Sequence, residues 1–200
     1  MHPILGDETS GRSSCASEPA DQIIARAQKG DCVAFAELFE LFNRPICTYL
    51  TRMVGNDELA RDLAQETFLK AWKNLPRLHG ELHFRAWLYR IATNVAYSHQ
   101  RRARLIRWLP WSKDDEEAGH VELSVAGPEE SVGEAELVQQ ALACLTPQYK
   151  ACLLLQIVEG FSQREVAEML GISEKSVGAN VCRGREQFRQ LYRQLKGAAE

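Results

Sequence analysis

The chain has 200 residues, which suits one large domain or two small ones. Hydrophobic residues make up 45% of it and charged residues 26%, as in ordinary globular proteins. No apolar run approaches the roughly 20 residues of a membrane span, so we expect no direct membrane insertion. Residues 1–20 lack the basic start and apolar core of a signal peptide. They are interpreted as a flexible tail, and we expect a cytoplasmic protein.

The cysteines do not indicate a metal site. No two of them form a C-x-x-C pair, and no histidine stands at zinc-finger spacing, so we expect no metal and no cofactor. Cys144 and Cys152 fall in apolar helical runs and are predicted to be small buried residues, whereas Cys15 is predicted to be exposed. The six cysteines are Cys15, Cys32, Cys47, Cys144, Cys152 and Cys182.

Charge is unevenly distributed along the chain. The net charge is −3, yet residues 99–108 and the stretch beyond Val181 are basic, and residues 112–136 are strongly acidic. This asymmetry indicates two basic surfaces joined by an acidic connection. The overall field does not favour phosphates, so we expect the chain alone to bind free DNA weakly.

The first predicted elements are two helices within residues 21–55. Asp21 and Asp31 are candidate caps, because a carboxylate can accept a hydrogen bond from an unpaired N–H of the first turn. Pro45 is predicted to interrupt the second helix or to begin a new one. Gly55 is predicted to end the run.

A third helix is predicted over residues 56–75. Asn56 or Asp57 caps it, and Pro76 stops it. Residues 77–108 begin as a loop and become a long helix whose far end is crowded with arginine.

The last third of the chain is predicted to form four short helices. Ser162 and Glu165 have capping-box spacing, Gly171 suits a left-handed helix end, and Ser173 can cap the next helix. This is the helix-turn-helix pattern, whose second helix normally enters the major groove. The stretch by itself is equally compatible with an ordinary helical hairpin. No segment alternates like a strand, so we predict an all-α chain of two small helical domains.

Three blocks in this order resemble bacterial RNA polymerase sigma factors of the extracytoplasmic-function (ECF) class, within the sigma-70 family. They are "DELARDLAQETFLKAWKNL", "FRAWLYRIATNVAYSHQRR" and "LTPQYKACLLLQIVEGFSQREVAEMLGISEKSVGANVCRGRE". The resemblance covers roughly residues 22–104 and 135–195. It implies a non-enzymatic protein that binds core RNA polymerase, recognises promoter DNA, helps melt the −10 element and is usually held by an anti-sigma factor.

The resemblance also implies a division of the chain. A tail is followed by a region 2-like helical bundle, an acidic flexible linker and a region 4-like helix-turn-helix domain. Their predicted ranges are 1–20, 21–106, 107–134 and 135–196.

Site residues are carried over by the resemblance in three groups. The core polymerase-binding residues are Asp62, Gln65, Glu66 and Phe68, an acidic and amide face with an apolar anchor. The −10 residues are Asn94, Tyr97, His99, Arg101 and Arg102. The −35 residues are Lys175, Ser176, Asn180, Arg183 and Arg185.

The recognition helix departs from the family pattern. Gly178, Ala179 and Asn180 stand where a basic residue, serine and arginine are usual. Losing two cations at a groove-facing end would remove contacts worth ~1–3 kcal/mol each. We therefore expect −35 reading that is altered in sequence or weaker than the family norm.

Two other classes of protein fit parts of the sequence. A stand-alone helix-turn-helix regulator of the response-regulator type predicts a first domain with alternating strands and a phosphoacceptor aspartate. A metal- or redox-sensing protein predicts paired cysteine ligands, which are absent from the sequence.

Overall fold

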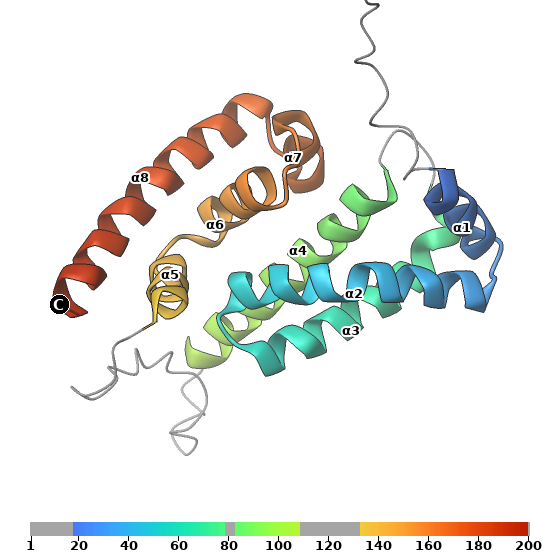
Figure 1. Ribbon diagram of the computed structural model, residues 1–200, viewed down its shortest axis with the longest axis horizontal. Helices are drawn as coiled ribbons and strands as arrows, with labels where there is room; N and C mark the ends of the chain where they lie inside the picture. Colours follow the sequence, from blue (N-terminus) through green and yellow to red (C-terminus); the bar gives the residue numbers. More distant parts are fainter. Residues whose placement is uncertain (1–17, 79–82, 109–132, 200) are drawn as a thin grey trace, which may run out of the picture.

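The computed structural model describes residues 18–78, 83–108 and 133–199. Within these ranges the secondary structure is entirely helical, and the helices form two groups that lie side by side (Figure 1). The prediction of an all-α, two-domain chain is confirmed. Cys15, most of the tail and residues 109–132 of the predicted acidic linker lie outside the described residues.

Four helices form the first domain. They are α1 (Glu18–Gln28), α2 (Cys32–Val54), α3 (Asp57–Asn74) and α4 (Phe84–Trp108), with a 3₁₀ turn (Leu75–Arg77) after α3. α1 begins three residues before Asp21, so the prediction that Asp21 caps this helix is wrong. The Asp31 carboxylate does cap α2, accepting from the N–H groups of Val33 and Ala34.

α2 continues through Pro45 without a break, which corrects the expectation of an interruption or a new start there. Because Pro45 is exposed, its ring and missing N–H disturb the solvent side of the helix. The buried neighbours Ile46 and Leu50 stay packed in the core. Gly55 ends α2 in the left-handed conformation, with φ of 79°.

The predicted beginning and end of the third helix agree with the structure. The Asn56 side chain caps α3 by accepting from the N–H of Leu59 at 2.8 Å. α3 ends two residues before Pro76, which lies in the 3₁₀ turn. In the core, the hydroxyls of Tyr49 and Thr93 are hydrogen-bonded at 2.7 Å, so α2 and α4 are joined by a satisfied polar contact as well as by apolar packing.

The second domain consists of α5 (Glu134–Ala143), α6 (Pro147–Leu153), a π-helical segment (Leu154–Val158), α7 (Gln163–Leu170) and α8 (Glu174–Ala199). α8 has 26 residues, so the prediction of four short helices is wrong for the last one. It packs along α5, α6 and α7, and this tertiary support carries the helix well past the recognition segment.

The helix-turn-helix has the local chemistry that the sequence predicts. The Ser162 hydroxyl accepts from the N–H of Glu165, whose carboxylate in turn accepts from the N–H of Ser162 at 2.8 Å. Gly171 ends α7 with φ of 65°. The Ser173 hydroxyl accepts from the N–H of Ser176 at 3.1 Å, which caps α8.

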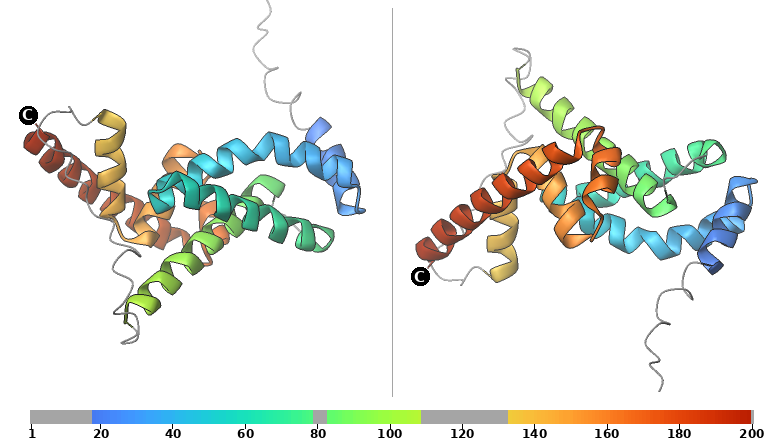
Figure 2. Two further views of the ribbon diagram at one scale, coloured as in Figure 1. Left: turned by 90° about the horizontal axis from the view of Figure 1, so that it is seen from below. Right: turned by 90° about the horizontal axis from the view of Figure 1, so that it is seen from above.

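The two domains are in contact. α7 packs on α4, and α5 and α6 meet α2, as the views from above and below show (Figure 2). In the described parts of the chain, none of the helices has the length and apolar character needed to span a membrane.

Candidate functional site

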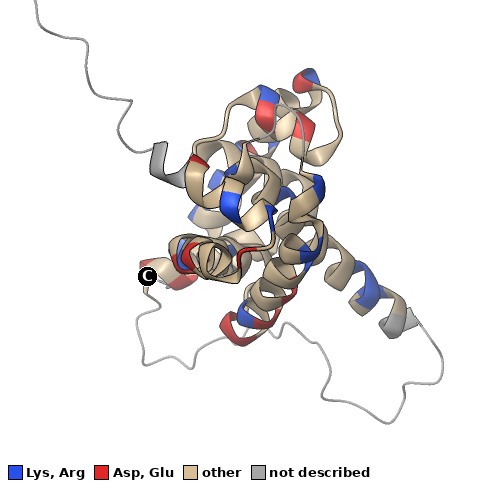
Figure 3. Ribbon diagram, turned by 90° about the vertical axis from the view of Figure 1, so that its right-hand side faces the viewer, with Lys and Arg blue, Asp and Glu red and all other residues tan. Residues whose placement is uncertain are grey.

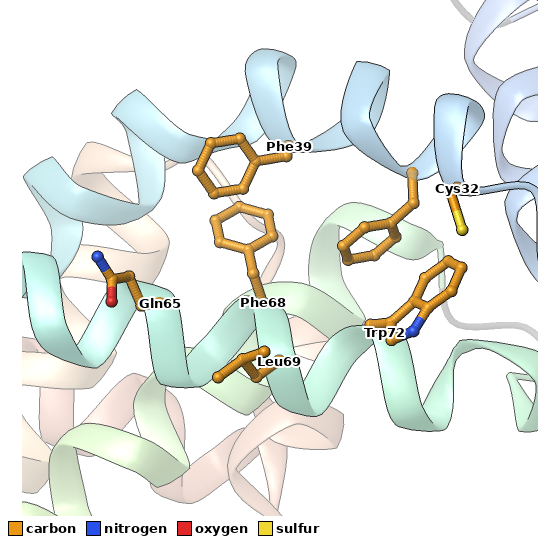
Figure 4. A pocket seen from close by; sticks show the side chains of 7 residues that line it. Cys32, Phe39, Gln65, Phe68, Leu69 and Trp72 are labelled. Carbon is orange, nitrogen blue, oxygen red and sulfur yellow. The ribbon is translucent and has the colours of Figure 1, made fainter.

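An apolar groove of about 460 Å³ lies between α2 and α3. Aromatic rings form its floor: Phe39 and Phe68 meet edge to face at 4.8 Å, and Phe35 and Trp72 lie 4.9 Å apart (Figure 4). Its lining residues are Cys32, Phe35, Phe39, Gln65, Phe68, Leu69 and Trp72. A groove lined this way is suited to receive an apolar side chain of a partner helix.

The structure separates the four predicted polymerase-binding residues into a rim and a floor. Asp62 and Gln65 are exposed, and the Glu66 carboxylate pairs with Lys70 at 2.7 Å. Phe68 is only 4% exposed, so it shapes the floor of the groove and does not project as an anchor.

Leu69 is the apolar residue that the sequence reasoning missed. It is 61% exposed and lines the groove beside Gln65 and Trp72. Residues 65, 69 and 72 follow the i, i+4, i+7 spacing of one helix face, which was the available signal.

The predicted −10 residues lie on α4, from its middle toward its C-terminal end. Asn94, Arg101 and Arg102 are exposed, and the arginines of α4 are blue in Figure 3. At 3.6 residues per turn, residues 94, 97 and 101 share one face, whereas His99 is turned roughly 140° from Asn94. The structure therefore brings three of the five residues onto one face.

Tyr97 is half-buried by the second domain. Its hydroxyl donates to the carbonyl of Pro147 at 3.3 Å, and burial raises its pKa. It lines a cleft of about 570 Å³ with Arg101, Arg104 and Tyr149. This side of α4 thus faces the start of α6.

The recognition helix exposes three of the five predicted −35 residues. Lys175, Arg183 and Arg185 are exposed. The Ser176 hydroxyl is hydrogen-bonded to that of Ser173 at 2.7 Å, within the helix cap. The Asn180 amide is half-buried and donates to the sulfur of Cys152 at 3.7 Å, so this side chain is directed toward α6.

Two small residues are exposed on the same side of α8 as Lys175 and Arg183. Ala179 and Cys182 are exposed, and helical spacing places them between Lys175 and Arg183. The sequence reasoning did not single out Ala179 as a contact residue; the available signal was the periodicity set by buried Val177 and Val181. The exposed stripe is Lys175, Ala179, Cys182, Arg183 and Glu186.

Gly178 faces α7, away from this stripe. A Cβ there would lie 3.3 Å from the amide nitrogen of Gln163, which donates to the carbonyl of Glu174 at 2.7 Å. Of the three atypical residues, Gly178 and Asn180 therefore face the scaffold and Ala179 lies on the exposed stripe.

The cysteines are dispersed. Cys152 is buried as predicted, where burial raises its thiol pKa, but Cys144 is exposed because it lies at the end of α5. Within the described residues, no three His, Cys, Asp or Glu side chains gather in a way that could hold a metal ion.

The helix-turn-helix and the arginine-rich end of α4 indicate a two-domain protein that binds DNA. The family models agree: residues 38–106 match sigma-70 region 2, and residues 135–188 match sigma-70 region 4.

Two curated relatives match over nearly their whole length. The chain is 32% identical to the ECF RNA polymerase sigma factor SigW of Bacillus subtilis, over 86% of this chain and 96% of the relative. It is 31% identical to the RNA polymerase sigma-H factor of Pseudomonas aeruginosa, over 84% of this chain and 91% of the relative. The chain belongs to the ECF class of sigma-70 family RNA polymerase sigma factors, proteins of transcription initiation.

Solved structures share the fold. The sigma factor RpoE of Bartonella quintana, solved with the anti-sigma factor NepR, matches with a TM-score of 0.65 and 21% identity, covering 80% of this chain and 96% of that one. CnrH, solved with the cytosolic domain of CnrY, matches with a TM-score of 0.62 and 24% identity, covering 86% and 96%.

Proposed function

We propose that this sigma factor docks on core RNA polymerase through the α2–α3 groove, holds the melted −10 strand on α4 and reads the −35 duplex with α8. The observation that carries the proposal is that three separate surfaces of suitable chemistry occur on one chain of this family. The protein acts by binding and catalyses no reaction itself. Its place of action is the cytoplasm.

The polymerase-docking surface combines the groove with an acidic edge. Leu69 and Trp72 offer apolar area, while Asp62 and Glu66 offer negative charge beside it. Such a surface fits an amphipathic partner helix with basic residues flanking an apolar one. Phe68 contributes by keeping the floor in shape.

For the −10 element, Asn94 and Arg101 share one face of α4 with Tyr97. The amide can both donate to and accept from a base edge, the phenol ring supplies a stacking surface, and the guanidinium binds the backbone. Arg102 lies at the edge of this face and adds a second cation, whereas His99 lies farthest from it.

For the −35 element, we propose that the exposed stripe of α8 enters the major groove. Lys175 and Arg183 contact phosphates or guanine edges, and Arg185 lies on the flank toward the DNA backbone. Ala179 places a methyl group at the centre of the stripe, where it suits contact with a thymine methyl. Ser176 and Asn180 support the helix through their contacts with Ser173 and Cys152.

An anti-sigma factor is a further expected partner, since the sigma factor RpoE, which shares this fold, was solved with the anti-sigma factor NepR.

Co-purification with core RNA polymerase tests the proposal. We expect the wild-type chain to be retained, Asp62→Ala/Glu66→Ala to be retained less, and Glu37→Ala, an exposed acid of α2 outside the groove lining, to behave as wild type. Failure of the wild type to bind polymerase, together with tight binding to duplex DNA alone, would favour a stand-alone regulator.

A further inference from the structure

α8 continues well beyond the part of the chain that matches the family. The match to sigma-70 region 4 ends at residue 188, whereas α8 ends at Ala199. With 26 residues and a rise of 1.5 Å per residue, this helix is about 39 Å long. The exposed stripe proposed to enter the major groove occupies its first half, from Lys175 to Glu186. The second half, residues 187–199, takes no part in the proposed base contacts.

Packing against α5 fixes the second half of α8 in place. The rings of Phe188 and Tyr192 are stacked with centroids 6.0 Å apart, and the Tyr192 hydroxyl donates to the Glu134 carboxylate of α5 at 3.2 Å. Phe188 and Leu191 also pack against the hydrophobic core. Because α8 is continuous from Glu174 to Ala199, the free side of this half has a fixed position relative to the reading stripe.

The charged side chains of this second half are all positive. Residues 187–199 include Arg189, Arg193 and Lys196 but no aspartate or glutamate. All three side chains are exposed, and none of them pairs with an acid in the part of the chain that the structure describes. These three residues are called the basic flank. Three cations on one fixed helix attract an anionic partner, although the whole chain has a net charge of −3.

The basic flank continues the DNA-facing side of the recognition helix. At 3.6 residues per turn, Arg185 and the three flank residues fall within a sector of roughly 80°, beside the exposed stripe. Arg193 lies about five turns beyond Lys175 and is therefore aligned with it along the helix. A duplex seated on the stripe would consequently have the basic flank next to it.

The major groove cannot contain the whole of α8. The groove is about 12 Å wide and curves around the duplex, so a helix of about 39 Å enters it with one part and leaves it with another. A helix that leaves the groove passes over the phosphates at its edge, as the C-terminal end of the homeodomain recognition helix does. Arg189 and Arg193 lie about 6 and 12 Å beyond Arg185 along the axis, where this crossing is expected.

An acidic protein surface is the competing partner of the same charge. Duplex DNA is the better match, because the basic flank shares one continuous helix with the reading stripe and lies beside it. A protein partner would require the flank to be free of the duplex while the stripe occupies the groove.

We propose that the basic flank binds backbone phosphates of the duplex next to the −35 element, on the one side where α8 leaves the major groove. The inference rests on the proposed function, because it takes α8 as the helix that reads the −35 element. A phosphate contact carries no base information, so the flank adds affinity and fixes orientation without changing the preferred sequence. It compensates for a reading segment that lacks two of the cations usual in the family.

The salt dependence of promoter binding tests the basic flank, with core polymerase in excess so that every chain is bound. Each cation on a phosphate adds about 0.9 to the slope of log K against log salt concentration. Arg189→Gln/Arg193→Gln/Lys196→Gln should therefore make the slope less steep by about 2 to 3. Between about 50 and 200 mM salt, the wild type should lose roughly 40-fold more affinity than this variant.

A matched variant separates local contact from net charge. Lys29→Gln/Arg44→Gln/Arg77→Gln removes the same charge from exposed positions of the first domain and should keep the wild-type slope. Circular dichroism should show equal helix content in the flank variant, because its three side chains are exposed and glutamine is a good helix former. The single variant Arg193→Gln repeats the test with a smaller change, a slope less steep by about 0.9.

Neutral phosphates locate the contact. Methylphosphonates placed one at a time beside the −35 element should weaken wild-type binding several-fold at two or three positions, all on one side. The flank variant should be insensitive at those positions. It should keep its preference for the −35 sequence over a scrambled one, because phosphate contacts act uniformly across sequences.

Three results would overturn the basic flank as a DNA-binding surface. They are a triple-variant slope within about 1 of the wild type, an equal change of slope in the matched variant, and phosphate sensitivity that the flank variant retains. Weaker binding of the flank variant to core polymerase, with an unchanged slope on DNA, would also overturn it and indicate an acidic protein partner. A wild-type holoenzyme with no preference for the −35 sequence would instead overturn the proposed function.

Discussion

Leu69 and Phe68 are adjacent in α3, and truncating them should have opposite consequences. Leu69 is 61% exposed in the free chain, so Leu69→Ala should leave folding nearly unchanged. Phe68 is 4% exposed beneath Phe35 and Phe39, so Phe68→Ala should cost about 3–5 kcal/mol of folding free energy.

The effect of Leu69→Ala on polymerase binding follows from its exposed area. Removing three carbon atoms at about 0.8 kcal/mol each gives about 2.4 kcal/mol for full burial. Because 61% of Leu69 is exposed in the free chain, docking can bury at most that fraction. The expected loss of binding free energy is therefore about 1.5 kcal/mol, or roughly a tenfold rise in Kd.

The assay is a titration of labelled protein with core polymerase, accompanied by thermal unfolding of each variant. Leu105→Ala is the matched control, because Leu105 has the same 61% exposure and lies on α4 away from the groove. If Leu69→Ala changes Kd by less than twofold, or no more than Leu105→Ala does, the groove is not the docking site.

Three further outcomes are expected. Gly178→Ala and Gly184→Ala gain the same helix propensity, about 1 kcal/mol, and each new Cβ meets an atom at 3.3 Å. At Gly178 the neighbouring atom is at the flexible end of the Gln163 side chain, whereas at Gly184 it is the Cβ of Tyr149, with the backbone of that residue close behind. Urea unfolding should therefore show Gly184→Ala as the less stable variant by about 1–3 kcal/mol. Replacing each thymine of the −35 element by deoxyuridine should weaken holoenzyme binding at one position by roughly fourfold, which corresponds to the burial free energy of one methyl group. Ala179→Gly should abolish that sensitivity. Equal binding at every position would exclude the methyl contact. Burial lowers the pKa of Lys150 to about 8 from the 10.5 of a free side chain, so the folded chain holds this proton less tightly than the unfolded chain does. The free energy of unfolding in urea should therefore rise as pH goes from about 8 to about 10.5, and Lys150→Met should remove this part of the pH dependence.

Local sequence determined where most helices begin and end. Asp31, Asn56 and Ser162 each place an oxygen where it accepts from an unpaired N–H, and Gly55 and Gly171 adopt the left-handed conformation that a Cβ disfavours. These effects act within a few residues, so they are readable without the fold. The three family blocks and their order are also visible in the sequence, and they identified the class of protein without the fold.

Neighbouring helices decided which side chains are available. Phe68 matched the family motif as an anchor, but packing against α2 places it in the floor and leaves Leu69 exposed. Pro45 was expected to break a helix, and α2 continues because its ring faces solvent.

The recognition helix shows the same division. Its presence and its caps were determined by the sequence, whereas the direction of Asn180 depends on Cys152, 28 positions earlier in the chain. The residues next to Lys150 in the sequence do not indicate what it contacts. Only the packing of the second domain on the first brings its ammonium to the carbonyl of Met53 at the end of α2, 97 positions away. Helix caps are local hydrogen bonds that a sequence specifies by itself; exposure and contact between domains depend on which distant surfaces meet, and only the tertiary structure determines them.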